Sequence, residues 1–113
     1  MSQSRRQQLQ RDPVLGEIVE RLVEVYHPER IYLFGSCARD EAGAHSDYDL
    51  MVVVRDDAPP RLRRSGPGYD ALWGLKAAAD VLVWTRSAFE ARLHLRASLP
   101  STILREGRLV YGA

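Results

Sequence analysis

The chain has one cysteine and no long apolar run, and each of these features excludes a class of protein. Its net charge of only +1 argues neither for nor against a nucleic-acid partner. Cys37 has no second cysteine to pair with, so an internal disulfide framework is excluded. No apolar segment approaches the ~20 residues of a membrane-spanning helix. Residues 1–11 are polar and basic, unlike a secretory signal. We therefore expect a cytoplasmic protein, without membrane contact and without direct nucleic-acid binding.

The length of 113 residues fits one domain, since domains usually have about 100–200 residues. We predict a flexible N-terminal arm over residues 1–11 and a single domain over residues 12–113. A chain of this length has little material for a separate substrate-binding module. A second protein, or a second copy of the chain in a homo-oligomer, is therefore expected to cover its active-site face.

Apolar periodicity predicts helices and strands that alternate along the chain. Asp12 is a helix cap before Pro13, and an apolar stripe at spacings of three and four follows it to Tyr26. We expect strands at residues 31–34, 47–54, 79–84 and 108–111. Shorter helices are expected at residues 36–41, 69–78 and 88–95, and from Ser101 or Thr102 to Gly107. This order predicts an α/β (α+β) fold, with a small mixed sheet flanked by helices.

Residues 56–68 are rich in proline, glycine and charge, which predicts a mobile loop. Arg61, Arg63 and Arg64 are interpreted as solvated charges of this loop, or as charges that steer ATP, RNA or an acidic partner. Trp73 and Trp84 are expected in the core, unless one of them faces a partner.

Two carboxylates lead into the strongest strand of the sequence, MVVV. Asp47 and Asp49 alternate with Tyr48 and therefore point to the same side of a strand. Neighbouring carboxylates raise each other's pKa unless a cation lies between them, and oxygen ligands of this kind suit Mg²⁺. Asp80 begins another apolar strand and is the candidate third carboxylate, or else a capping residue at a helix–strand junction.

A Gly-Ser pair supplies the complementary half of this candidate site. Gly35 at a strand end allows close backbone approach to a ligand, and a helix beginning near Ser36 would direct free N–H groups at an anion. Arg39 adds positive charge one turn later, unless it forms only a surface ion pair. Carboxylates for a metal beside a phosphate seat indicate phosphoryl chemistry.

This pattern resembles the nucleotidyltransferases of the DNA polymerase β type in their minimal form. Their signature is Gly-Ser, a spacer of about ten residues and Asp-x-Asp, and here Gly35-Ser36 is followed by CARDEAGAHS and Asp47-Tyr48-Asp49. The segments IYLFGS, ADVLVW and ILREGRLVY extend the resemblance from Asp12 onward. Within the family, the chain is most similar to the minimal nucleotidyltransferase (MNT) antitoxins encoded beside HEPN-domain toxins. The chain departs from the family pattern at Asp40, where glycine is frequent.

The resemblance implies transfer of AMP from Mg-ATP to a hydroxyl, with a tyrosine of a HEPN ribonuclease toxin as the acceptor. It implies that Asp47, Asp49 and Asp80 are catalytic and hold Mg²⁺, while Gly35, Ser36 and Arg39 seat the triphosphate of ATP. The alternatives are an antitoxin that neutralises its toxin by binding alone, and a nucleotidyltransferase acting on a small molecule.

Overall fold

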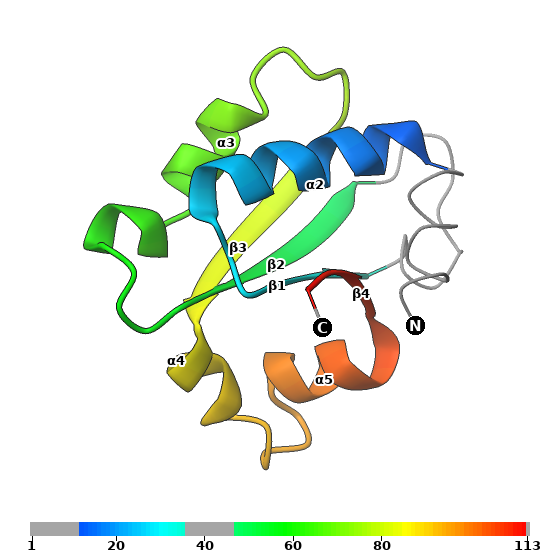
Figure 1. Ribbon diagram of the computed structural model, residues 1–113. Helices are drawn as coiled ribbons and strands as arrows, with labels where there is room; N and C mark the ends of the chain where they lie inside the picture. The colour runs from blue at the N-terminus through cyan, green and yellow to red at the C-terminus, as the bar shows by residue number, and fades with distance from the viewer. Residues whose placement is uncertain (1–11, 36–46, 113) are drawn as a thin grey trace.

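The computed structural model describes residues 12–35 and 47–112, which form a four-stranded mixed sheet with helices on both faces (Figure 1). The strands lie in the order β3-β2-β1-β4. β1 pairs antiparallel with β2 and with β4, whereas β2 and β3 are parallel. The strand bounds are Arg30–Phe34 (β1), Tyr48–Val54 (β2), Ala79–Thr85 (β3) and Arg108–Tyr111 (β4). The predicted α+β class and all four strands are confirmed.

Helix α2, Pro13–Tyr26, covers one face of the sheet together with α3, Gly66–Ala71 (Figure 1). The Asp12 side chain caps α2 by accepting a hydrogen bond from the N–H of Leu15 at 3.0 Å. His27 ends the helix in the left-handed conformation, with φ of 46°. The predicted apolar stripe is the buried face of α2, and it packs on alternate residues of the strands. The largest fully buried side chains of this cluster are Leu15, Ile18, Leu22, Ile31, Leu33 and Leu50.

The opposite face of the sheet is covered by α4, Arg86–Glu90, and α5, Leu99–Glu106 (Figure 1). Thr85 and Ser98 cap these two helices with their hydroxyls. The core on this face consists of the strand residues that alternate with the first cluster, together with one buried residue from each helix. Its buried members are Tyr32, Met51, Val53, Phe89 and Ile103.

The segment between β2 and β3 differs from its prediction. Residues 56–68 contain a 3-10 helix, η1 (Pro60–Arg63), and α3 begins at Gly66 instead of Tyr69. The reason is a tertiary contact, because the Tyr26 hydroxyl donates to the carbonyl of Arg64 at 2.6 Å and accepts from the N–H of Gly68 at 2.8 Å. A buried hydrogen-bonding group of α2 thus fixes a segment whose composition is typical of a loop.

Three further predictions need correction. Trp73, expected in the core, has a side chain that is 86 % exposed, because α3 ends at Ala71 and the chain turns outward. Helix α4 ends at Glu90, short of residue 95, and turns follow it. Helix α5 begins at Leu99, since Ser98 acts as the cap in place of Ser101 or Thr102. Among the described residues, no helix has the length and apolarity to cross a membrane.

Candidate active site

Three strand ends bring predicted site residues together at one edge of the sheet. Asp49 is the second residue of β2, and its cross-strand neighbours are Phe34 on β1 and Asp80 on β3. Asp47 lies immediately before β2 and is exposed, as is Asp80. The structure places the strands of Asp49 and Asp80 side by side.

Strand alternation sets the side to which these carboxylates point. Leu50 and Val81, one residue after Asp49 and Asp80, are both buried in the core cluster beneath α2. Asp49 and Asp80 therefore extend from the other face of the sheet, the face that α4 and α5 partly cover. Leu82, two residues beyond Asp80 on that face, is 36 % exposed. The sheet surface beside the carboxylates is thus open.

Gly35 ends β1 in a conformation that only glycine adopts easily. Its φ of 75° lies in the left-handed region. A Cβ at this position would lie 3.3 Å from the Cγ of Asp49 and closer still to its Oδ2. The glycine therefore allows the backbone to turn directly against the Asp49 carboxylate. The sequence predicted close approach at Gly35, and the group approached is this carboxylate.

The surroundings of Asp49 destabilise its ionised carboxylate. Partial burial raises the pKa of the Asp49 carboxyl, and the negative charges of Asp80 and Asp47 raise this pKa further. A bound cation would remove that cost. The donor set, with oxygen atoms from carboxylates only, fits Mg²⁺ by its chemistry. Within residues 12–35 and 47–112, however, no group of three or more His, Cys, Asp or Glu side chains lies in position to hold an ion.

Tyr48, between the two aspartates, is a positioning residue that the sequence did not reveal. Its hydroxyl donates to Asp12 Oδ2 at 2.8 Å, on the α2 face of the sheet. Its N–H donates to the carbonyl of Ala78 at 3.0 Å. The start of β2 is therefore tied to the first turn of α2 and to the segment before β3. Alternation between Asp47 and Asp49 was the available signal, because it directs Tyr48 toward the helix.

Several predicted residues cannot be placed. Ser36 and Arg39 lie outside the described residues, as does the helix expected at residues 36–41. The described part of the chain thus joins Gly35, Asp49 and Asp80, and places Asp47 near enough for its charge to act on Asp49.

A comparison with protein families matches residues 15–110 to the nucleotidyltransferase domain. No curated protein sequence matched the chain significantly.

Two solved structures share the fold. One is the crystal structure of a toxin–antitoxin with AMP-PNP, which is 21 % identical with a TM-score of 0.56, covering 85 % of this chain and 72 % of that chain. The other is a mutant of the toxin–antitoxin MntA–HpeT in which two aspartates, two positions apart, are replaced by glutamate. It is 19 % identical with a TM-score of 0.54, covering 84 % of this chain and 71 % of that chain. At these identities, the likeness concerns the fold.

Proposed function

Because the chain belongs to the nucleotidyltransferase domain family, we propose that it transfers AMP from Mg-ATP to a hydroxyl of a protein acceptor. The acceptor is a tyrosine of a HEPN-domain ribonuclease toxin, so the protein acts as an antitoxin in the cytoplasm. The observation that carries the proposal is the pairing of Asp49 with Asp80, beside a glycine turn that closes on the Asp49 carboxylate. The two toxin–antitoxin structures of the same fold support the choice of partner, and AMP-PNP in one of them supports an adenine nucleotide.

In this proposal, Asp47, Asp49 and Asp80 hold Mg²⁺ with their carboxylate oxygens. When bound, the ion would stabilise the negative charge on the phosphate oxygens of ATP. Gly35, with Ser36 and Arg39, seats the triphosphate.

Asp80 also accepts the proton of the acceptor hydroxyl. Its position suits this task, because β3 is the edge strand and Asp80 is exposed there, whereas Asp49 is covered by the turn at Gly35. The hydroxyl oxygen forms a bond to the α-phosphorus of ATP, the bond from that phosphorus to the bridging oxygen breaks, and pyrophosphate leaves.

Asp80→Asn tests the proposal because it keeps the side-chain shape and removes the charge. We expect AMP transfer to fall by about 10²–10⁴-fold, the usual contribution of general-base catalysis. Affinity for Mg-ATP should fall less, since Asp47, Asp49 and Gly35 remain. The assay is transfer of labelled AMP to the separately purified product of the adjacent gene, the proposed toxin, with calorimetry for Mg-ATP. Asp70→Asn, an exposed carboxylate on α3, is the matched control.

Near wild-type transfer by Asp80→Asn would show that Asp80 is only a junction residue, and the three-aspartate site would be wrong. Neutralisation of the toxin by the wild-type protein without any AMP transfer would instead establish inhibition by binding alone.

A further inference from the structure

A groove of about 590 Å³ lies at the outer edge of the sheet, away from the carboxylates. β3 is an edge strand, and it supplies one part of the lining. The other parts are the last residue of η1 and the α4 region. The lining residues are Arg63, Val83, Trp84, Thr85, Ala88 and Arg92.

The charged side chains that line this groove are all positive. Arg63 and Arg92 are exposed, no acidic side chain lines the groove, and neither arginine has a carboxylate partner in the described part of the chain. The Nε of Arg63 donates to the carbonyl of Ala58 at 2.9 Å, which holds this guanidinium in place.

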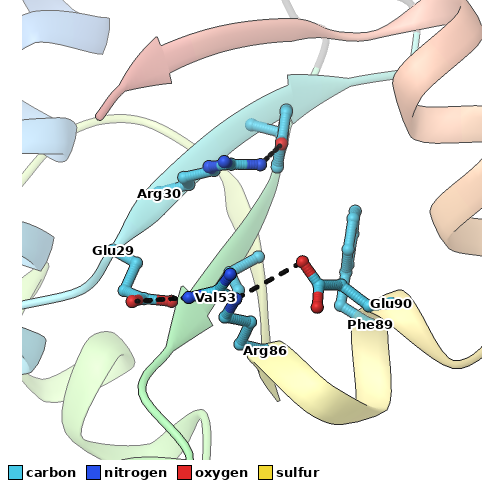
Figure 2. Close-up of a pocket in the computed structure, with 7 residues that line it drawn as sticks. Glu29, Arg30, Val53, Arg86, Phe89 and Glu90 are labelled. Atoms are coloured by element: carbon cyan, nitrogen blue, oxygen red, sulfur yellow. Dashed lines mark hydrogen bonds and ion pairs between the residues drawn. The ribbon is translucent and has the colours of Figure 1, made fainter. Parts of the chain in front are cut away.

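A neighbouring hollow of about 320 Å³ shows the contrast (Figure 2). There Arg86 lies 3.7 Å from Glu29 and 3.3 Å from Glu90, so its positive charge is already balanced within the fold. The groove at Arg63 and Arg92 instead presents unbalanced positive charge, which favours an acidic ligand.

The backbone of β3 adds a second feature that favours a polypeptide. The N–H of Val81 points away from β2, because it donates to the Tyr69 hydroxyl at 3.1 Å. By strand alternation, the backbone N–H groups of Val83 and Thr85 point the same way, toward the groove. An extended chain pairs with such an edge through its own backbone groups. Apolar contact with Val83 and Trp84 would accompany that pairing.

The groove and the candidate active site share one strand, β3. Asp80, Leu82 and Trp84 alternate on the same face of β3, and Leu82 between the other two is 36 % exposed. At about 3.3 Å per residue, Trp84 lies roughly 13 Å along the strand from Asp80. A segment bound at Trp84 would therefore reach Asp80 with about four residues of extended chain.

We propose that this groove docks an acidic and apolar segment of the acceptor protein, so that the acceptor hydroxyl is delivered along β3 to Asp80. The identity of the partner rests on the function proposed above. Arg63 and Arg92 bind carboxylates of the segment, Trp84 and Val83 contact its apolar side chains, and the free edge of β3 pairs with its backbone.

Asp56, near the start of α4, makes a protein segment a better fit than RNA. Asp56 accepts hydrogen bonds from the hydroxyl and N–H of Ser87 at the start of α4, and Glu90 lies exposed on the same helix. The charge of Asp56 repels a continuous phosphate backbone, while that of Glu90 is paired with Arg86. A peptide can instead place its carboxylates at the two arginines alone.

The test is the double variant Arg63→Glu/Arg92→Glu, with Arg96→Glu as the matched control. Arg96 is equally exposed and does not line the groove. Binding of the product of the adjacent gene, the proposed toxin, is measured by surface plasmon resonance, and affinity for Mg-ATP by calorimetry. We expect the double variant to weaken partner binding by about 30-fold or more, as for lost charge pairs at interfaces. Its affinity for Mg-ATP and the partner binding of the control should equal those of the wild type.

The possible outcomes distinguish the docking proposal from the proposed transferase function. Partner binding by the double variant at wild-type strength, or no partner binding by the wild type, would overturn docking at this groove. Loss of binding to an oligouridylate probe with unchanged partner binding would also overturn it, and would assign the groove to RNA. Loss of partner binding in the double variant, with no AMP transfer by the wild type, would keep the docking surface and refute the proposed transferase function.

Discussion

The two ends of the sheet handle charge in opposite ways. At one end Asp47, Asp49 and Asp80 bring negative charges together, and the pKa of Asp49 is raised by burial and by the other two. At the other end Arg86 forms ion pairs with both Glu29 and Glu90 (Figure 2). The second arrangement is what folding stability favours, and the first opposes it unless a cation binds. The difference supports the proposed placement of catalysis at the carboxylate end.

The largest expected effect of this difference is on catalysis. Asp49→Asn should lower AMP transfer by about 100-fold or more. The reason is that a bound metal lowers the activation barrier by several kcal/mol through charge stabilisation of the transition state. The same substitution should raise the free energy of unfolding of the metal-free protein by about 0.5–1 kcal/mol, the range for partly exposed charges, since it removes a repelled charge. Transfer assays and thermal unfolding measure the two effects.

Glu29→Gln is the control at the opposite end of the sheet, where it removes one of the two ion pairs of Arg86. It should leave transfer unchanged and lower stability slightly. Lower stability of Asp49→Asn than of the wild type would contradict the interpretation of the carboxylate end as strained.

A smaller effect is expected from the backbone at the same end. Gly35→Ala should destabilise the protein by about 2–3 kcal/mol, because a positive φ and a steric contact with Asp49 act together. Gly74→Ala separates the two causes. Gly74 has a φ of 91°, and a Cβ added there would meet open space, so only the backbone cost of about 1–2 kcal/mol should remain. Equal destabilisation by the two substitutions, measured by urea unfolding, would show that the contact with Asp49 costs nothing.

The smallest expected effect is on stability in acid, at the end of the sheet that carries Asp56 and Arg86. The Ser87 hydroxyl and N–H donate to Asp56 and lower its pKa below the usual 3.8, and Arg86 adds to this shift. A carboxyl with a lowered folded-state pKa contributes stability above its unfolded-state pKa, and this contribution is lost as the pH falls through the folded-state value. The difference in melting temperature between the wild type and Asp56→Asn should therefore be present at neutral pH and disappear in strong acid. A difference that is constant across this pH range would exclude the titration of Asp56 as its cause.

The strands and α2 could be predicted from the sequence because local signals and burial agree there. Asp12 and Pro13 start the helix as predicted, and the apolar stripe that follows is the face that packs on the sheet. The sequence places an Asp at the start of each of two apolar strands, and the structure pairs these residues, Asp49 and Asp80. In these regions periodicity alone identifies the buried side, so local sequence is sufficient.

The segment between β2 and β3 could not be predicted because tertiary contacts decide its structure. Gly66 and Gly68 are typical of turns, yet the Tyr26 hydroxyl holds this region in a helix. The apolarity of Trp73 predicts a core position, although Arg21 from α2 donates to the carbonyls of Ala71 and Trp73 and fixes an outward turn. The groove of Arg63 and Arg92 joins residues of η1 and the α4 region, so no local pattern signals it.

Packing of the core fixes the register between the parallel strands β2 and β3, and thereby the position of Asp80 beside Asp49. Leu50 lies opposite Val81, and these side chains are 0 % and 1 % exposed. A slip of β3 by one residue would turn Val81 to the open face and push Asp80 into the apolar layer beneath α2, at a large cost for the unpaired charge. We therefore expect the turns of the β2–β3 connection to accommodate a one-residue insertion or deletion, while β3 keeps its register with β2. The apolar residues of β3 thus specify the level at which its aspartate meets Asp49.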